Sequence, residues 1–266
     1  SACLVGSEMC IRDRLHSERG YIVPLVSDQE DNCVDELIKP IKVLYFTDPV
    51  CSTCWVIQPI LRKLKLEYDD YLNIEYHMGG LLPSWLGYDK GTIKTPSDVS
   101  QHWEDMSKNY SIPLDGDVWI EDPLNSSFPP SIAFKAAQIQ NNNKAILFLR
   151  RLKEMLFLEK KNITNIEWIE NAALSCGLDS SILLKDMEGK AIELFQEDLR
   201  LTAENKITSF PTFLFIDASE TKLILKGIQS YAKFEEVIKQ LIPNVVKKKW
   251  NLSAINLFKK FKILSS

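Results

Sequence analysis

Residues 41–55, IKVLYFTDPVCSTCW, carry the strongest structural signal in this chain. The run from Ile41 to Thr47 is rich in β-branched, aromatic and aliphatic side chains, which predicts a buried strand. A helical pattern follows from Ser52 to Tyr68. The pair Cys51 and Cys54 therefore lies where a strand ends and a helix begins.

This position lowers the expected pKa of the cysteine thiols. A helix start offers unpaired backbone N–H groups and the positive end of the helix dipole, which stabilise a thiolate. In Cys-x-x-Cys pairs the pKa of a thiol falls from about 8.5 to roughly 3.5–7.5. We therefore expect Cys51 to be an exposed, acidic nucleophile. Cys54, one turn into the helix and more buried, is the expected resolving thiol that attacks a mixed disulfide.

A zinc site is the structural alternative for the pair. Tetrahedral zinc needs four ligands, usually supplied by a second close pair of cysteines or histidines. The remaining cysteines and histidines offer no such pair: Cys3, Cys10, Cys33, Cys176, His16, His77 and His102. The sequence therefore predicts no metal.

Composition narrows the class of protein. The chain has 266 residues, of which 45% are hydrophobic and 26% charged, enough for a packed core. A net charge of −4 argues against a broad nucleic-acid-binding surface. No run approaches the roughly 18 apolar residues that a spanning helix needs, so no transmembrane segment is predicted.

Neither end of the chain resembles its body. Residues 1–14 lack helical or strand periodicity, and their arginines follow the short apolar run instead of preceding it, unlike a secretory signal. We interpret this stretch as a leader that is not native, followed by an N-terminal segment over residues 15–40. With no export signal in view, we expect a cytoplasmic protein with reduced thiols.

The C-terminal tail, residues 246–266, is basic. Residues 245–266 carry six lysines and no acid, which leaves a net charge of −10 for residues 1–244. On a helical wheel, Trp250, Leu257, Phe258, Phe261 and Leu264 share one side, opposite most of the lysines. The tail can dock on the acidic body, contact a partner or touch an anionic membrane. We favour docking or partner contact, because a body of this charge is repelled by anionic lipid.

The order of the remaining elements predicts an α/β fold. A second strand covers Tyr71 to Met78, helices dominate from Ser97 to about Lys206, and two strands and a helix close the body. The plan is a βαβ unit over residues 41–82, an all-helical insertion over 83–190 and a ββα unit over 191–245. Pro59 should kink the first helix, and Gly189 should break the last helix of the insertion.

A proline heads one of the closing strands. Pro211 precedes a hydrophobic run, and because proline cannot donate to a sheet ladder it must lie at a strand start or edge. Together with the cysteine pair, this proline resembles the thioredoxin superfamily, and the helical insertion resembles its DsbA-like branch. More narrowly, the chain is similar to the FrnE-like, predicted protein-disulfide isomerase group, which is related to the YjbH/SpxH-type adaptors for proteolysis. Four motifs carry this likeness: Asp48-Pro49-x-Cys-x-x-Cys-Trp55, Met78-Gly79-Gly80-Leu81, His102-Trp103-Glu104 and Ser209-Phe210-Pro211-Thr212.

The resemblance implies a thioredoxin fold and thiol–disulfide exchange, as oxidoreductase or isomerase, on protein substrates. It implies a cis Pro211 beside the cysteine pair, and a Phe210 whose backbone binds an extended peptide. No cofactor is needed beyond the redox-active disulfide Cys51–Cys54, and a thiol reductant or oxidant is the expected redox partner. The alternative is an adaptor that binds a partner for regulated proteolysis and whose cysteines sense redox state. A glutathione-using isomerase or transferase is less consistent with the sequence, because such proteins usually lack a second cysteine like Cys54.

One residue departs from the family pattern. Thioredoxins and DsbA proteins carry an acid six residues before the nucleophile, and this chain has Tyr45 there. We consider Asp48, Glu75 and His77 as possible proton acceptors for Cys54, although Asp48 could simply cap the coming helix. Trp55, His102 and Trp103 are predicted to bind substrate.

Overall fold

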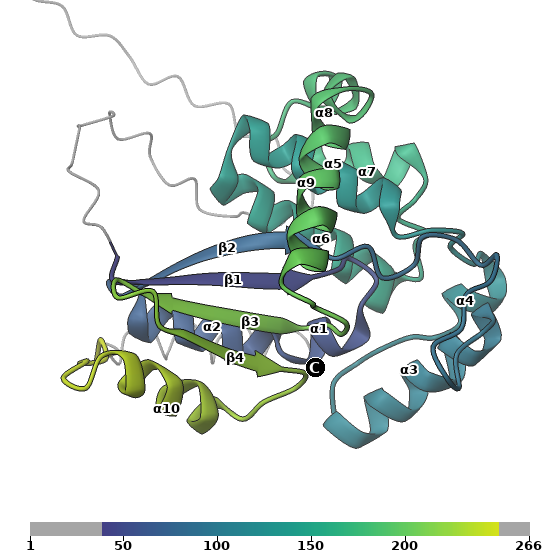
Figure 1. Cartoon of the computed structure of the whole chain (residues 1–266). Coiled ribbons are helices and arrows are strands. Elements are labelled where there is room, and N and C mark those ends of the chain that lie inside the picture. Colours follow the sequence, from purple (N-terminus) through teal and green to yellow (C-terminus); the bar gives the residue numbers. More distant parts are fainter. Residues whose placement is uncertain (1–38, 250–266) are drawn as a thin grey trace, which may run out of the picture. The chain divides into compact units, whose positions relative to one another are not determined.

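The computed structural model describes residues 39–249, whose core is a four-stranded sheet (Figure 1). The strands are β1 (Ile41–Thr47), β2 (Leu72–Met78), β3 (Thr212–Asp217) and β4 (Lys222–Lys226), in the order β2-β1-β3-β4. Strand β1 runs parallel to β2 and antiparallel to β3, which pairs antiparallel with β4. The predicted α/β class, with a βαβ unit and a ββα unit, is confirmed.

The first helix is broken where the proline predicted a kink. Helix α1 covers Ser52–Val56 and α2 covers Gln58–Tyr68, with Ile57 between them. Pro59 occupies the first turn of α2, where its missing N–H costs no helical hydrogen bond. Helix α1 is therefore a single short turn that carries the cysteine pair.

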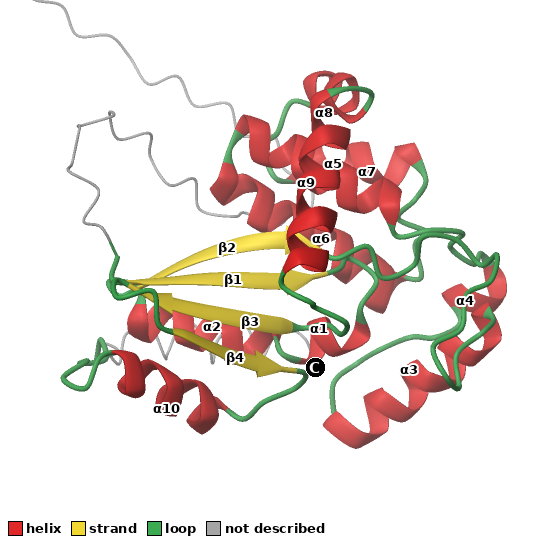
Figure 2. Cartoon of the chain, in the orientation of Figure 1, coloured by secondary structure: helices red, strands yellow, loops and turns green. Residues whose placement is uncertain are grey.

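All the described elements between β2 and β3 are helices (Figure 2). They are α3 (Pro96–Tyr110), α4 (Val118–Glu121), α5 (Phe128–Gln140), α6 (Asn142–Glu159), α7 (Ile166–Ser175), α8 (Ser180–Met187) and α9 (Lys190–Glu204); α10 (Tyr231–Leu241) follows β4. The break at Gly189 is confirmed. Helix α3 is capped by Thr95, whose hydroxyl accepts from the N–H of Asp98 while the Asp98 carboxylate accepts from the N–H of Thr95.

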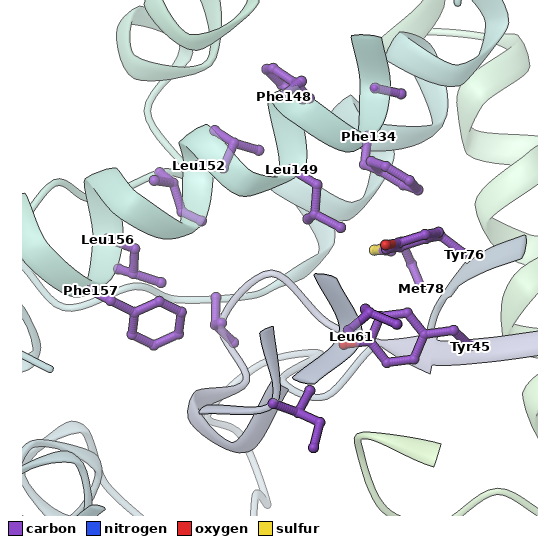
Figure 3. Packing of buried hydrophobic residues seen from close by; sticks show 14 of the residues in the cluster. Tyr45, Leu61, Tyr76, Met78, Phe134, Phe148, Leu149, Leu152, Leu156 and Phe157 are labelled. Carbon is purple, nitrogen blue, oxygen red and sulfur yellow. The ribbon is translucent and has the colours of Figure 1, made fainter. Parts of the chain in front are cut away.

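The two faces of the sheet are covered differently. Tyr45 of β1 points to the face that packs against α2, α10 and the insertion, where its ring lies parallel to that of Phe213, 4.5 Å away. Figure 3 shows side chains of α5 and α6 gathered over this face, near Tyr45 and Tyr76. Leu44 and Phe46 point to the other face, where a smaller cluster includes Leu201 of α9.

Some predictions concern residues outside the described range. The leader (1–14), nearly all of the N-terminal segment (15–40) and residues 250–266 of the tail lie outside the described residues. The internal domain boundaries stay predictions. None of the helices between residues 39 and 249 is long and apolar enough to cross a membrane.

Candidate active site

Cys51 and Cys54 are held together by the first turn of α1. Cys51 is the N-cap of that helix, and its Sγ accepts the backbone N–H of Cys54 at 3.1 Å. The hydroxyl of Thr53 also lies 3.1 Å from Cys51 Sγ. Both cysteines are free thiols in the structure. The residue that caps the helix is thus the cysteine itself, and the capping role considered for Asp48 is wrong.

The expectation that Cys51 is exposed is also wrong. Its side chain is 3% exposed, and burial raises the pKa of Cys51, as does the neighbouring thiol of Cys54. Burial alone would raise the pKa of Cys54 too, but the interaction of its sulfur with the Cys51 thiol and the positive charge of Lys153 bring it below the usual value. The helix start stabilises negative charge on the pair, and the surrounding protein decides which sulfur carries it.

A cavity of about 510 Å³ opens beside Cys51. Cys51 and its neighbours Ser52 and Thr53 line it, whereas Cys54 is fully buried and does not. An entering thiol or disulfide would therefore meet Cys51 first. The opposite walls come from the loop after β2, from α3 and from the segment before β3; among the residues that they contribute are Gly79, Gly80, Trp85, His102, Trp103, Thr208 and Phe210.

Phe210 and Pro211 close the cavity beside α1. The peptide bond between them is cis. The carbonyl oxygen of Phe210 accepts the hydroxyl of Thr53 at 2.8 Å, so this backbone group is already tied to the cysteine loop. The Phe210 ring lies against Gly79, where an added Cβ would be 2.0 Å from the ring. Glycine at position 79 is therefore what lets the Phe210 ring approach the strand end.

Of the predicted substrate-binding residues His102, Trp103 and Trp55, only the first two border the cavity. His102 of α3 faces the cavity, with Nε2 3.4 Å from the Ser52 hydroxyl, and burial lowers its pKa. Trp103 also borders the cavity but is 1% exposed, packed edge-on against Trp119. Trp55 lies outside the cavity: its indole N–H donates to the carbonyl of Pro113 at 3.1 Å, and it lines a separate groove.

Asp48 is a buried anchor at the end of β1. Its carboxylate accepts the N–H of Val50 at 3.0 Å, the N–H of Leu81 at 2.7 Å and the hydroxyl of Ser127 at 2.9 Å. Burial raises its pKa to about 6, despite these donors and the charge of Lys153. The Asp48 side chain therefore joins the cysteine loop to the cavity wall at Leu81 and to Ser127, the N-cap residue of α5. Its backbone N–H also helps to lower the pKa of Cys54.

The other two candidate proton acceptors are occupied elsewhere. Glu75 forms an ion pair with Lys42 at 3.0 Å, and His77 Nδ1 lies 2.8 Å from Asp198 of α9. Burial alone would lower the pKa of His77, but its bonds to Asp198 and Glu75 raise it. Both residues pair with β1 at Leu44 and Phe46, on the face of the sheet turned to α9. Glu75 and His77 therefore interact with Lys42 and Asp198, and not with the cysteines.

A buried lysine was missed by the sequence analysis. Lys153 of α6 is 1% exposed, and its Nζ donates to the hydroxyl of Thr47 at 3.3 Å. Its positive charge favours the ionised forms of both cysteines and of Asp48, and so offsets part of the rise in pKa that burial causes. A signal for it exists, because Lys153 occupies the same helical face as the buried residues Leu149, Leu152 and Leu156. Tyr45, where the family has an acid, is fully buried, and burial raises its pKa well above the usual value.

The other cysteines lie away from the pair or outside the described residues. Cys176 is half-buried at the end of α7, while Cys3, Cys10 and Cys33 lie outside the described residues. Within residues 39–249, no three His, Cys, Asp or Glu side chains lie together as a candidate metal site.

Comparison with known proteins agrees with this geometry. The family model described as "Thioredoxin" matches residues 44–236. The ClpXP adapter protein SpxH of Halalkalibacterium halodurans is 32% identical over 257 residues, which cover 94% of this chain and 83% of that protein. SpxH of Bacillus subtilis is 30% identical, over 77% of this chain and 68% of its own length. Among solved structures, the cytosolic disulfide reductase DsbM of Pseudomonas aeruginosa is similar in fold, with a TM-score of 0.60 and 18% identity over 75% of this chain and 99% of that one.

Proposed function

The chain belongs to the thioredoxin family and to the group of relatives that includes the SpxH adapters, and we propose that it is itself an adapter. In this role it binds a partner protein and presents it to the ClpXP protease. The observation that carries the proposal is the 32% identity to such an adapter over 94% of the chain. The adaptor alternative from the sequence thus becomes the main function, ahead of disulfide exchange.

The geometry of the cysteine pair supports the adapter function over rapid disulfide exchange. A fast thiol–disulfide enzyme needs a nucleophile that is accessible and largely thiolate at neutral pH. Cys51 is 3% exposed, and burial raises its pKa, so its attack on a protein disulfide should be slow. An adapter needs no fast turnover. Its cysteines can instead sense oxidation: a disulfide joins Cys51 Sγ to Cys54 Sγ, two protons leave, and two electrons pass to a peroxide or a small-molecule disulfide.

Protein half-lives test the adapter proposal. In cells that lack the chain, pulse-chase proteomics should find a small set of proteins that persist several-fold longer. One of these, purified, should be degraded faster by ClpXP when the wild-type chain is added. The double variant Cys51→Ser, Cys54→Ser should still accelerate degradation but lose any response to peroxide. Unchanged half-lives throughout, or no acceleration of purified ClpXP, would exclude the adapter function.

A second function is favoured by one specific observation, the position of Cys51 at the cavity. There its thiolate can attack a substrate disulfide to form a mixed disulfide and release one substrate thiolate. Cys54 then displaces the second substrate sulfur, so that the substrate is reduced and the pair is oxidised. Insulin reduction with excess dithiothreitol tests this: wild type should exceed Cys51→Ser by at least tenfold if exchange is an activity of the chain. Equal rates would leave the pair a redox sensor only.

A further inference from the structure

A groove of about 710 Å³ runs along α2, apart from the cysteine cavity. Its walls come from α2, from Arg150 of α6 and from the segment after α3. Much of the lining is apolar although it faces solvent, and Leu66 is 45% exposed. The apolar lining consists of Trp55, Pro59, Leu66, Ile112 and Pro113. An exposed apolar surface of this kind marks a binding site.

The described chain ends beside this groove. Glu67 lines the groove, and its backbone carbonyl accepts the N–H of Lys248 at 2.9 Å. The Lys247 ammonium is paired with Glu235 and lies 3.7 Å from the Glu67 carboxylate. The Lys248 ammonium lies 2.7 Å from Asp70. These contacts fix residues 247 and 248 at the C-terminal end of α2, where Glu67 also lines the groove.

We propose that the groove is the binding site for residues 250–266 of the same chain. As a helix, these 17 residues would extend about 25 Å, at 1.5 Å per residue, whereas the 11 residues of α2 span about 16 Å. The segment is thus long enough to follow α2 as far as Trp55. Because it is covalently attached at the groove's end, its effective concentration there is in the millimolar range or above.

Charge determines which side of the segment enters. The groove carries three cations, Arg62, Lys63 and Arg150, against one carboxylate, that of Glu67; burial lowers the pKa of Arg62, and the charge of Arg150 lowers it further. Lysines 259, 260 and 262 would be repelled by these cations if they pointed inward. The opposite side of the predicted helix carries Trp250, Leu257, Phe258 and Phe261, which match the apolar lining. The lysines therefore point to solvent.

Hydrogen–deuterium exchange on the full chain tests this contact. Backbone amides of residues 250–266 should exchange at least tenfold more slowly in the wild type than in Leu66→Asp, which places a charge in the groove. The matched control Leu174→Asp, at an exposed leucine of α7 (61% exposed), should leave the protection unchanged. Phe258→Asp, in the segment itself, should remove protection from both the segment and the groove. Circular dichroism checks that each variant is folded.

Three outcomes would overturn the proposal. The first is the same fast exchange of residues 250–266 in wild type and Leu66→Asp. The second is protection that disappears on dilution, which would assign the groove to a second copy of the chain. The third is protection that arises only when vesicles containing phosphatidylserine are added, which would assign the segment to a membrane surface. Protection that is independent of concentration and lost in Leu66→Asp supports the intramolecular contact.

Discussion

The cavity beside Cys51 and the groove beside Trp55 begin four residues apart and differ in character. The cavity is lined by thiol, hydroxyl and imidazole groups as well as aromatic rings, and its wall is fixed by the buried Asp48 carboxylate. The groove is lined mainly by apolar side chains and carries an excess of cations. Cys51 borders the cavity, and Cys54 is buried in the core beneath it. A single helical turn therefore separates the redox chemistry of the chain from a surface suited to apolar contact.

This separation has a physical origin in α1. Cys51 is the N-cap of α1 and borders the cavity, whereas the indole of Trp55, four residues on, donates to the carbonyl of Pro113 and lines the groove. The break before Pro59 then lets α2 leave in its own direction, with the groove along its exposed side. If the two surfaces are independent, changes at one should leave the other unaltered.

The largest effect is expected from Asp48→Ala. Three buried donors lose their acceptor, each worth about 1–3 kcal/mol, and relief of the buried charge offsets part of this, which leaves a loss of about 3 kcal/mol in the free energy of unfolding. Urea unfolding measures it. Asp179→Ala, which removes only the cap of α8, should cost about 1 kcal/mol. Equal losses in the two variants would mean that Asp48 does not hold the cavity wall.

Alkylation should distinguish the two cysteines more sharply than the sequence suggests. In the reduced native chain, iodoacetamide should modify Cys51 about a hundredfold faster than Cys54, because attack needs access as well as a thiolate, and only Cys51 borders the cavity. Mass mapping of timed samples measures both rates, and labelling in urea provides the unprotected rates. Faster modification of Cys54 would show that the cavity does not control access to the pair.

Asp48 also predicts a pH dependence. Its pKa is about 6 in the folded chain and near 4 when unfolded, so the folded state binds the extra proton between these values. The free energy of unfolding should therefore fall as pH rises, by about 2 kcal/mol between pH 4.5 and 7 relative to Asp48→Asn. Urea unfolding of both chains across this range measures the difference. Parallel profiles would contradict the assignment.

A smaller effect is expected from Lys153→Met. The positive charge that lowers the pKa of both cysteines is lost, so the thiolate population of the pair at neutral pH should fall about tenfold, one pKa unit. The thiolate ultraviolet absorbance of the reduced chain, followed against pH, measures this. Stability should be unchanged or higher, because an apolar side chain replaces a buried charge. Lys65→Met, at a half-buried lysine of α2, is the control and should leave the thiolate titration unaltered.

The contrast between the two surfaces also shows where reading the sequence succeeds. Strand β1 and the break before Pro59 lie where they are predicted, because each depends on neighbouring residues: side-chain periodicity in the strand and a missing N–H in the helix. The Cys-x-x-Cys pair belongs to this class as well. Its place at a helix start is a local property.

Other features depend on residues that are distant along the chain. Lys153 reaches Thr47 across 106 positions, and the Phe210 carbonyl reaches Thr53 across 157. The burial of Cys51 follows from the segments that pack over it, so a local argument from the strand–helix junction gave the wrong exposure and left out the burial that raises its pKa. The sequence by itself determined the strand–helix junction and the reactive pair upon it. Only the tertiary structure decided how accessible that pair is and which charges surround it, because desolvation and Coulomb interactions depend on distance in space and not on separation in sequence.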